Sequence, residues 1–364
     1  MKIAIIGARG IPNNYGGFEQ FAEYLSVGLV NLGNRVTVYN SHKHPFQESS
    51  WNGVEIIHCN DPEYKYGTIG QFIYDYNCIL DTRKKDYDII LQLGYTSSAV
   101  WGWLLPRKKS VVTTNMDGLE WKRTKFSRPI QTFLKYAEKL GVKHSDYLIS
   151  DSVGIQEHIK NKYKKESIYI PYGSHVFTSP NEDVLKKYNI KAFKYNMLIA
   201  RLESENSIEI ILDGAVVAND NLPFLVIGNN ETKYGKYLRN KFKENNNIQF
   251  LGGIYDMNVL NNFRFYSNIY FHGHTVGGTN PSLLEAMGSN ALICANDNIF
   301  NKSILGDDAY YFNNEKDIAS LLKKIKKSEN LAFLERNVEK IKNIFSWEEI
   351  TKQYHHHFKT IVRN

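Results

Sequence analysis

The chain has 364 residues, and this length favours two domains because a single hydrophobic core stops growing at about 250–300 residues. Hydrophobic residues make up 42% of the chain and charged residues 23%, which excludes a disordered or collagen-like protein. The longest apolar stretch, around Ala99–Leu105, is far shorter than the roughly 20 residues that cross a bilayer. The opening MKIAIIGARG is typical of a buried strand and a turn rather than of a signal peptide, so we expect a cytoplasmic protein that spans no membrane.

The cysteines and the histidine run near the end of the chain give no sign of a disulfide framework or a metal centre. Cys59, Cys78 and Cys294 are scattered and form no CxxC spacing, which is typical of small buried hydrophobic residues. Residues 355–357 are consecutive histidines in a helical pattern, so on one helix they point in different directions. We therefore expect no metal.

Short β-branched runs alternate with longer amphipathic stretches in the first half of the chain. The strand-like runs are Lys2–Ile6, Arg35–Tyr39, Val54–His58, Ile89–Leu93, Ser110–Thr114 and Tyr147–Ser150. The helix-like stretches are Phe18–Leu32, Gly70–Thr82, Ser97–Leu105 and Ile130–Lys143. Runs that are apolar almost throughout are typical of strands buried on both faces of a parallel sheet. They predict an α/β fold, with a doubly wound, Rossmann-like domain over residues 1–173.

A similar pattern begins again after a break around residues 168–180, where a short strand is followed by Tyr172, Gly173 and Pro180. The strands predicted beyond the break are Met197–Ala200, Phe224–Ile227, Ile248–Leu251, Ile269–His272 and Ala291–Ala295. The predicted helices are Ser207–Val217, Lys233–Glu244, Asp256–Phe263 and Pro281–Gly288. We predict a second Rossmann-like domain over residues 174–345 and a last helix in residues 346–364 that packs back on the first domain. Two such domains are expected to face each other across a cleft, with ligands beyond the carboxyl ends of the strands.

Positive charge is concentrated in one segment of the first domain. The formal net charge of the chain is +7, and the stretch between Leu104 and Ser145 holds ten Lys or Arg against three acids. The aromatic residues in and beside this stretch are Trp101, Trp103, Trp121, Phe126, Phe133 and Tyr136. Such a segment suits an anionic membrane face, a pyrophosphate or nucleic acid, although a solvated helix face has the same composition. Because no RNA-binding aromatic motif is present, we expect no nucleic-acid partner.

The turn after the first strand, GARGIPNNYGGFE at residues 7–19, is rich in glycine. Glycine lets the backbone approach a ligand closely, and the helix that follows offers N–H groups to an anion. The GxGxxG spacing of NAD sites is absent. We interpret the turn as a loop that closes on a diphosphate; the alternative is a glycine-rich loop without a ligand. The residues assigned to this phosphate and acceptor loop are Arg9, Gly10, Gly16, Gly17 and Glu19.

The strongest motif is HGHTVGGTNPSLLEAMG at residues 272–288. Pro281 suits the first position of a helix, with Asn280 as its N-cap. The N–H groups near Ser282–Leu284 are then expected to lack partners and to point at a negative ligand. Glu285 falls one turn into this helix, where its carboxylate could accept hydrogen bonds from ribose hydroxyls or, alternatively, complete a capping box.

A third site is Arg201, in the sequence ARLESEN at residues 200–206, at the end of the second domain's first strand. Its guanidinium is placed for bidentate contact with a phosphate. The alternative is a surface arginine that binds no ligand.

Four motifs carry a resemblance to a known family. They are GGFE at 16–19, IPYG at 170–173, ARLESEN at 200–206 and NPSLLEAMG at 280–288, and the segment FSWEE at 345–349 before the last helix is also similar. On these motifs the whole chain resembles the retaining nucleotide-sugar glycosyltransferases of family 4, which have the GT-B fold. The resemblance implies transfer of a sugar from a nucleoside diphosphate donor.

The resemblance assigns roles on the donor side. Glu285 matches the second acid of the family's paired-glutamate motif, which binds the donor ribose, and Arg201 matches the arginine that binds the donor phosphate. Gly277 stands where most relatives have the first glutamate, and Asn206 stands where relatives usually have lysine, so the usual glucose-type donors are in doubt. The donor-binding residues that we expect are Arg201, Asn206, Gly277, Thr279, Asn280, Ser282, Leu283 and Glu285.

Together with the segment VGGTNPSLLEAMG, these departures resemble a narrower group of bacterial rhamnosyltransferases, which take dTDP-L-rhamnose and build capsule or cell-wall polysaccharide. Rhamnose is a 6-deoxy sugar whose C6 needs no hydrogen-bond partner, so glycine at position 277 is compatible with it. The alternatives left open are a donor of hexose, N-acetylhexosamine or fucose type, a nucleotide-sugar epimerase of the same shape, and a binding protein without catalytic activity.

The catalytic candidates lie in the first domain. Asp117 and Asp151 each follow a predicted strand, where a carboxylate could orient an acceptor hydroxyl or stabilise a cationic oxocarbenium-like state. The alternatives are a turn-forming Asp117 before glycine and an Asp151 that caps a helix. Tyr172 lies in the hinge, where its hydroxyl could reach donor or acceptor.

The resemblance further implies front-face attack with retention of configuration, in which the leaving phosphate takes the acceptor's proton. No DxD pair follows a strand, so we expect no obligatory metal and no other cofactor. The acceptor is expected to be a saccharide on a polyprenyl pyrophosphate. The basic segment would then hold the enzyme on the anionic inner face of the plasma membrane as a peripheral protein.

Overall fold

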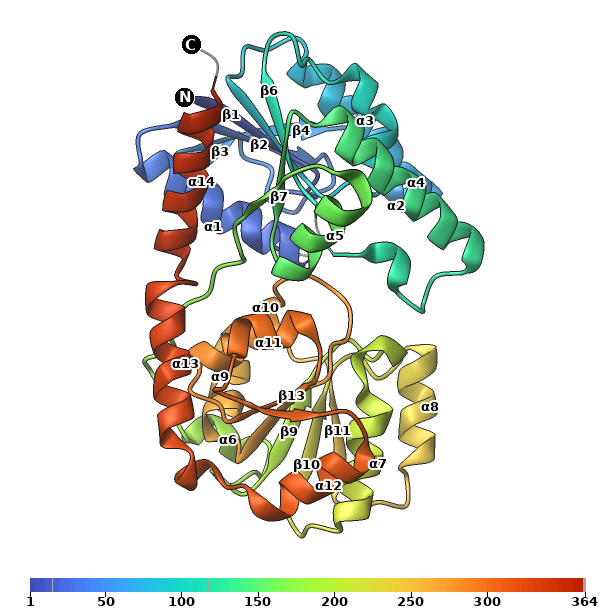
Figure 1. The fold of residues 1–364 in the computed structure, drawn as a ribbon, viewed down its shortest axis with the longest axis vertical. Coiled ribbons are helices and arrows are strands. Elements are labelled where there is room, and N and C mark those ends of the chain that lie inside the picture. Colours follow the sequence, from blue (N-terminus) through green and yellow to red (C-terminus); the bar gives the residue numbers. More distant parts are fainter. Residues whose placement is uncertain (15, 117, 363–364) are drawn as a thin grey trace. The chain divides into compact units, whose positions relative to one another are not determined.

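The structure is a computed structural model and describes residues 1–14, 16–116 and 118–362. The chain divides into two compact units, which Figure 1 shows with their labelled helices and strands. The first unit consists of Met1–Lys122, Phe126–Gly173 and the segment that begins at Trp347, and the second consists of Arg123–Lys125 and Ser174–Ser346. Within the described ranges, no helix is long and apolar enough to cross a bilayer.

The first unit is built on a sheet that, in the described part of the chain, has the strand order β3-β4-β2-β1-β5-β6-β7-β8. The strands are β1 (Lys2–Ile6), β2 (Arg35–Ser41), β3 (Ser50–Trp51), β4 (Val54–Cys59), β5 (Ile89–Leu93), β6 (Val111–Asn115), β7 (Tyr147–Ser150) and β8 (Ile168–Tyr169). Neighbouring strands are parallel except β3 and β4. The order turns back between β1 and β5, and ligands of doubly wound sheets bind at the carboxyl ends of two such strands.

The helices of the first unit connect these strands, and the last helix of the chain joins them. They are α1 (Gly17–Asn31), α2 (Glu63–Tyr66), α3 (Thr68–Thr82), η1 (Ser98–Leu104), η2 (Glu120–Lys122), α4 (Arg128–His144), α5 (Val153–Tyr163) and α14 (Trp347–Ile361), where η marks a 3₁₀-helix. Helix α14 packs against α1. It is also tied to the sheet, because the ring of His357 hydrogen-bonds the Thr113 hydroxyl at 3.1 Å.

The second unit is built on a parallel sheet with the order β11-β10-β9-β12-β13-β14 among the described residues. The strands are β9 (Asn196–Ile199), β10 (Phe224–Ile227), β11 (Ile248–Gly252), β12 (Ile269–His272), β13 (Ile293–Asn296) and β14 (Tyr310–Phe312). The helices are α6 (Asp183–Lys186), η3 (Ser204–Asn206), α7 (Ile208–Ala218), α8 (Lys233–Lys241), α9 (Met257–Tyr266), α10 (Pro281–Gly288), α11 (Ile299–Leu305), α12 (Glu315–Lys324), η4 (Lys327–Glu329) and α13 (Leu331–Asn343). In this sheet the order turns back between β9 and β12.

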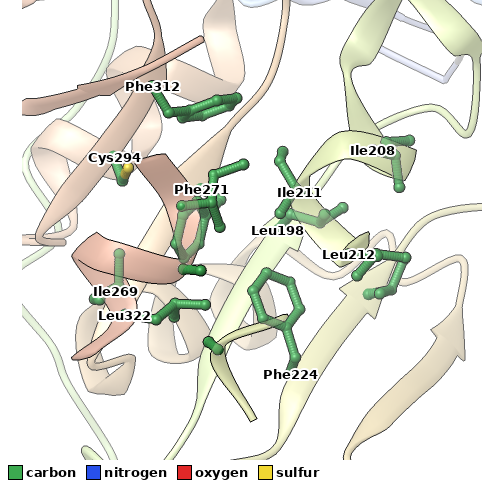
Figure 2. Close-up of a cluster of buried hydrophobic side chains, with 14 of the residues drawn as sticks. Leu198, Ile208, Ile211, Leu212, Phe224, Ile269, Phe271, Cys294, Phe312 and Leu322 are labelled. Atoms are coloured by element: carbon green, nitrogen blue, oxygen red, sulfur yellow. The ribbon is translucent and has the colours of Figure 1, made fainter. Parts of the chain in front are cut away.

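One face of the second sheet carries the core of the unit. Figure 2 shows Leu198, Phe224 and Phe271 on the strands packed with Ile211 of α7 and Leu322 of α12. Phe271 and Ile211 are at most 1% exposed, and full burial of one such side chain stabilises the fold by about 1.5–3 kcal/mol. This packing fixes β9 and β12 side by side, and with them the residues that follow both strands.

The structure confirms the predicted α/β class and most predicted elements. The bounds predicted for β1, β5, β7, β10, β12 and α10 agree with the structure. The stretch 97–105 was predicted as an amphipathic helix, but it forms the 3₁₀-helix η1. A Cβ on Gly102 would lie 2.6 Å from Cβ of His144 on α4, and this close approach accounts for the glycine inside η1. The segment between β13 and α14 forms α11, β14, α12, η4 and α13, which the sequence pattern did not predict.

Candidate functional site

The second sheet's turning point brings the ends of β9 and β12 together. Ala200 and Arg201 follow β9, and Gly273 and His274 follow β12. A Cβ on Gly273 would lie 2.1 Å from the carbonyl oxygen of Asn206, so only glycine allows the two connections to approach this closely. The hydroxyl and backbone N–H of Thr275 both donate to the Glu205 carbonyl, at 2.7 and 3.2 Å. The two loops are therefore held together at the switch point, which is the place between β9 and β12 where the strand order turns back.

Arg201 extends from this edge with its side chain exposed. Among the described residues, no hydrogen bond or ion pair engages its guanidinium. Its carbonyl oxygen accepts a hydrogen bond from the side-chain amide of the buried Asn206 at 2.7 Å. Asn206 thus holds the backbone of the loop, and the five N–H donors of Arg201 stay available for an anion.

Helix α10 begins at this edge with the expected cap but without the expected open donors. The side chain of Asn280 accepts the N–H of Ser282 at 2.9 Å. The carbonyl of Asn280 accepts the N–H groups of Leu283 and Leu284 at 3.0 and 3.3 Å. The expectation that Ser282–Leu284 offer free N–H groups is therefore wrong, because Asn280 satisfies all three. The positive end of the helix dipole remains at this position.

The donors that are available lie just before the helix. Within the described ranges, the backbone N–H groups of Gly277 and Gly278 have no hydrogen-bond partner. Gly277 has φ +144°, and a Cβ there would meet nothing within 4 Å. The backbone rather than crowding therefore selects glycine at position 277, since a glutamate would have to adopt a conformation that L-residues rarely populate. Thr279 is buried at 4% exposure, which anchors the loop.

Glu285 lies one turn into α10 and makes an ion pair instead of a capping box. Its Oε2 lies 2.6 Å from an NH2 nitrogen of Arg264 on α9. The same guanidinium nitrogen donates to Oγ of Ser282 at 3.2 Å, and Oγ of Ser282 also lies 2.9 Å from the Tyr270 hydroxyl. The Arg264 side chain is 1% exposed and that of Glu285 is 16% exposed. The buried guanidinium therefore holds one oxygen of the carboxylate, while part of the Glu285 side chain remains open to solvent. Leu283, a predicted ligand contact, is fully buried and supports the helix.

Two stacked imidazoles stand beside Arg201. The rings of His272 and His274 lie 4.4 Å apart with 17° between their planes. Burial and the charge of Arg201 lower the pKa of His274 to about 3, and burial also holds the pKa of His272 well below its usual range. Both rings are therefore neutral near pH 7 and add hydrogen-bonding capacity without charge.

The glycine-rich turn of the first unit has a different character. A Cβ on Gly10, at φ +135°, would lie 2.4 Å from Cγ of Asn40, so the turn is packed tightly on β2. The Arg9 guanidinium makes two hydrogen bonds to Glu63, at 2.8 and 2.9 Å. The backbone N–H of Arg9 donates to the buried carboxylate of Glu19 at 2.8 Å. Arg9 and Glu19 thus engage the protein itself and shape the loop.

The start of α1 is the open part of this turn. Gly16 is the N-cap of α1, and a Cβ on Gly17 would meet nothing within 4 Å. The Tyr172 hydroxyl reaches the same helix start, where it donates to the Gly17 carbonyl at 2.8 Å and lies 3.1 Å from the side-chain oxygen of Gln20. Its ring lies edge-on to Trp347 of α14, with ring centroids 5.0 Å apart. Tyr172 therefore joins α1, α14 and the end of the first unit.

Of the two predicted catalytic carboxylates, the structure describes Asp151 but not Asp117. Asp151 directly follows β7, the neighbour of β6 in the sheet. The next residue, Ser152, caps α5 with its hydroxyl, which accepts the N–H of Ile155. Asp117 lies outside the described residues.

Trp121 and Glu138 of the basic segment make their contacts inside the first unit. Buried Glu138 of α4 accepts hydrogen bonds from Lys162 at 2.7 Å and Trp121 at 2.8 Å. Burial alone would raise the pKa of Glu138, but these bonds and those from His158 and Tyr163 lower it to about 2. The exposed basic side chains of α4 are Arg128, Lys135, Lys139 and Lys143.

The sequence pattern predicted a role for Gly277 but not the participation of Arg264 and Gly278 or of the backbone N–H of Gly277. Arg264 stands in the run Phe263-Arg264-Phe265-Tyr266 of a helix, and a lone charge among large apolar side chains is the local signal that it is buried and paired. The unbonded N–H groups of Gly277 and Gly278 have no such signal, because hydrogen bonding in a loop depends on its tertiary path.

A cavity of about 360 Å³ in the second unit lies away from this edge. It is lined by the first residues of three strands, Asn196, Phe224 and Ile248. Ligands of doubly wound sheets bind at the carboxyl ends instead, so we assign the candidate site to the edge that carries Arg201 and Glu285.

Comparisons with known proteins identify the fold. Residues 1–175 match a family described as a domain of unknown function, DUF1972. No curated protein matches. Sucrose-phosphate synthase from Thermosynechococcus elongatus is similar at TM-score 0.82 and 16% identity, over 99% of this chain and 98% of that chain.

Two further solved structures are similar over nearly their whole length. HepE from Anabaena, in complex with UDP and glucose, has TM-score 0.75 and 15% identity over 99% of this chain and 100% of that chain. An α,α-trehalose 6-phosphate synthase from Burkholderia multivorans has TM-score 0.69 and 11% identity over 99% of this chain and 98% of that chain. The likeness confirms the predicted GT-B fold.

Proposed function

We propose that the protein is a glycosyltransferase that takes a nucleoside diphosphate sugar as its donor. One observation carries the proposal: the edge of the second sheet combines the exposed Arg201, the unbonded N–H groups of Gly277 and Gly278, and the fixed carboxylate of Glu285. A guanidinium and backbone N–H groups suit a diphosphate, and a carboxylate suits the hydroxyls of a ribose. The GT-B fold and the UDP and glucose in the structure of HepE support this proposal.

The chemistry assigned to this edge is stabilisation of the leaving group. The bond between the anomeric carbon and the diphosphate oxygen breaks while the acceptor oxygen bonds the same carbon. Negative charge then grows on the diphosphate, where Arg201 and the two glycine N–H groups stabilise it. In the proposed front-face reaction the leaving phosphate oxygen takes the acceptor's proton and configuration is retained. No step of this scheme calls for a metal ion.

The proposed donor is dTDP-L-rhamnose. Gly277 supports this choice because it has no side chain, whereas family relatives carry a glutamate at this position. Its φ of +144° disfavours any residue other than glycine there. A sugar without a hydroxyl at C6 loses least from that missing carboxylate. The proposed acceptor is a saccharide on a polyprenyl pyrophosphate, and Asp117, Asp151 and Tyr172 of the first unit remain the proposed groups that act on it.

A donor panel tests the reaction. Purified protein is incubated with dTDP-L-rhamnose, UDP-glucose, UDP-N-acetylglucosamine or GDP-fucose, each with and without a synthetic lipid-linked saccharide. The products are identified by mass and by anomeric configuration. We expect dTDP release only with dTDP-L-rhamnose plus acceptor, and a product that keeps the anomeric configuration of the donor. Turnover of donor alone would identify an epimerase, and transfer from another donor would overturn the rhamnose assignment. An inverted product would contradict front-face attack.

We further propose that helix α4 binds the first unit to an anionic membrane surface. Arg128, Lys135 and Lys139 are exposed on this helix, and the exposed fractions of Ile130 and Tyr136 are 45% and 56%. Basic and apolar side chains exposed together suit a lipid headgroup layer, and each basic residue contributes about 1 kcal/mol near such a surface.

Charge reversal of α4 tests membrane binding. The triple variant Arg128→Glu/Lys135→Glu/Lys139→Glu should lose most of its sedimentation with vesicles rich in anionic lipid. Binding by the wild type should fall as salt rises. The matched control reverses the exposed Lys316, Lys323 and Lys324 of α12 and should bind as the wild type does. Equal binding by all three proteins would contradict the proposal.

A further inference from the structure

Two imidazole rings beside Arg201 are buried without the hydrogen bonds that buried polar groups normally make. His272, the last residue of β12, is 1% exposed, and neither of its ring nitrogens has a hydrogen-bond partner among the described residues. Nδ1 of His274 is buried and unbonded in the same way. Because nearly all buried polar groups in folded proteins are hydrogen-bonded, three unsatisfied nitrogens in one place call for a physical explanation.

The backbone around His274 is fixed on both sides of the residue. Its carbonyl oxygen accepts the side-chain amides of Asn298 and Asn301 at 3.0 and 3.2 Å. The next residue, Thr275, donates its hydroxyl and its backbone N–H to the loop that follows β9. The ring itself stacks on that of His272, with centroids 4.4 Å apart. The loop therefore holds the imidazole of His274 in place without using its nitrogens.

The position of the ring proton follows from which nitrogen is shielded. A neutral imidazole carries one N–H donor and one bare nitrogen that accepts. Nδ1 of His274 is buried without a partner, so a proton there would be left unsatisfied, which is costly. Nε2 is not buried in this way, and in the described part of the chain it has no partner either. The proton therefore belongs on Nε2, which presents an N–H donor to the exterior.

The charges around the ring keep it neutral. Burial and the charges of Arg201 and Arg123, which also belongs to the second unit, lower the pKa of His274 to about 3. On the other side of the stack, the charge of Arg264 disfavours protonation of His272. The ring thus offers an uncharged donor beside the charged donors of Arg201. A ligand that uses both needs several acceptor oxygens and a negative charge, and a diphosphate has both.

We propose that His274 donates its Nε2–H to an oxygen of the diphosphate beside Arg201 and that His272 positions the donating ring by stacking. The inference rests on the proposed function, which makes the diphosphate part of the donor. When the bond from the anomeric carbon to the diphosphate oxygen breaks, its electron pair stays with that oxygen, and a hydrogen bond to the growing charge stabilises it. His274 keeps its proton throughout, because the leaving phosphate takes the proton of the acceptor.

Nucleotide binding without turnover tests the contact. Dissociation constants of UDP and dTDP are measured by calorimetry on the full chain. His274→Phe keeps a stacked ring and removes the N–H, so it should weaken the binding of both nucleotides at least tenfold, since both carry the diphosphate. A smaller loss would overturn the inference while leaving the proposed function intact. Absence of binding of both nucleotides to the wild type would overturn both.

Two amide side chains locate the donor nitrogen. The amide nitrogen of glutamine can take the place of Nε2, whereas that of asparagine reaches only as far as Nδ1. His274→Gln should therefore bind UDP within threefold of the wild type, and His274→Asn should lose at least tenfold. This pair decides the question even where His274→Phe does not fold. Equal affinities of the two variants would contradict a donor at Nε2.

The pH dependence of binding separates a neutral donor from a cation. Protonation of the diphosphate affects all variants alike, so it cancels in the ratio of the dissociation constants of His274→Phe and the wild type. This ratio should stay constant between about pH 8 and about pH 6, where an unperturbed histidine would become charged. A ratio that rises several-fold on acidification would show that His274 binds as an imidazolium and would overturn the proposal.

A buried histidine with a protein partner gives the matched control. His357 of α14 is 6% exposed, burial lowers its pKa to about 4, and its Nε2 lies 3.1 Å from the Thr113 hydroxyl. His357→Phe should lower the free energy of unfolding, because it leaves that hydroxyl unsatisfied, and should keep the UDP affinity within threefold of the wild type. A loss of affinity as large as in His274→Phe would show that general loosening, and not a lost contact with the diphosphate, weakens binding.

Discussion

The two switch points of the molecule share an architecture and differ in what their arginines do. At each one, a glycine lets two connections approach closely: a Cβ on Gly7 would lie 2.3 Å from the Leu93 carbonyl oxygen, and one on Gly273 would lie 2.1 Å from that of Asn206. An arginine follows β1 as Arg9 and β9 as Arg201. The doubly wound topology therefore supplies the same frame twice.

The difference lies in the partners of the two arginines. Arg9 is held by Glu63 in a bidentate pair, whereas the Arg201 guanidinium is exposed and, among the described residues, makes no hydrogen bond or ion pair. A paired arginine contributes to the shape of its loop, and an arginine without a partner carries charge that a ligand can use. Topology therefore locates a possible site, but the satisfaction of polar groups decides whether that site binds an anion.

The largest effect is expected from removing the arginine of the second switch point. Arg201→Ala should lower kcat/KM at least a hundredfold, because two charge-assisted hydrogen bonds of about 1.5–3 kcal/mol each are lost. Arg9→Gln is the matched variant and should change nucleotide affinity less than threefold. It should instead lower the free energy of unfolding by about 1 kcal/mol through loss of the Glu63 pair. Steady-state kinetics, calorimetry and urea unfolding measure these quantities. Equal kinetic losses in both variants would contradict this difference, since both switch points would then hold the diphosphate.

Two glycines of the first turn should differ in the same way, with Gly10 affecting stability and Gly17 affecting ligand binding. Gly10→Ala should destabilise the first unit by about 2 kcal/mol or more. The φ of Gly10 is +135° and the new Cβ would meet Asn40 at 2.4 Å, so the substitution strains the backbone and overpacks the turn. Gly17→Ala has open space and should leave stability unchanged or slightly higher at a helix start.

Kinetics of Gly17→Ala then test whether the start of α1 takes part in donor binding. If the start of α1 approaches the donor, the added methyl group lowers kcat/KM at least tenfold while the unfolding midpoint stays within about 1 °C. Wild-type kinetics in Gly17→Ala would leave the first switch point without a role in donor binding. Thermal unfolding and initial rates on the same preparations give both numbers.

Much of the fold could be predicted because its strands are short, apolar and separated by clear turn signals. The runs Lys2–Ile6 and Ile269–His272 coincide with β1 and β12, since strands buried on both faces need continuous apolar sequence. Helices α12 and α13 escaped prediction although α12 has a capping box formed by Asn314 and Asp317. Their many lysines masked the apolar face that meets the core.

The candidate site could be located from sequence but not resolved into its contacts. The N-cap role of Asn280 follows from the Asn-Pro-Ser order alone, and the structure confirms it. That the same residue also satisfies the N–H groups of Leu283 and Leu284 depends on the pitch of the first turn. The pairing of Arg264 with Glu285 joins residues 21 positions apart, which only the packing of α9 under α10 determines.

Two buried groups, one in each unit, should contribute opposite pH dependences, because burial brings the pKa of each to about 7 from opposite sides. In the first unit, burial raises the pKa of Asp75 on α3 from 3.8 to about 7, although the Ser97 hydroxyl bonds its carboxylate. In the second unit, burial lowers the pKa of Lys327 from 10.5 to about 7. Asp75 thus holds its proton in the folded unit and releases it in the unfolded unit between about pH 4 and 7. Lys327 releases its proton in the folded unit and holds it in the unfolded unit between about pH 7 and 10.5.

The contribution of Asp75 to the stability of the first unit should therefore fall as pH rises toward 7, and the contribution of Lys327 to the stability of the second unit should rise as pH increases above 7. Each slope approaches about 1.4 kcal/mol per pH unit. All five tryptophans, Trp51, Trp101, Trp103, Trp121 and Trp347, belong to the first unit. Tryptophan fluorescence therefore follows unfolding of the first unit, while circular dichroism follows both.

Two substitutions isolate these slopes. Relative to the wild type, Asp75→Asn should lose the falling contribution of Asp75 to the fluorescence-detected stability between about pH 4 and 7, with the exposed Asp86→Asn as control. Lys327→Met should reduce the dichroism-detected dependence above about pH 7 and stabilise the second unit most below about pH 7, where the buried lysine is still charged. Exposed Lys326→Met should change nothing. If both units kept the wild-type slopes in these variants, other groups would set the pH response, and the contrast between the units would not extend to their buried charges.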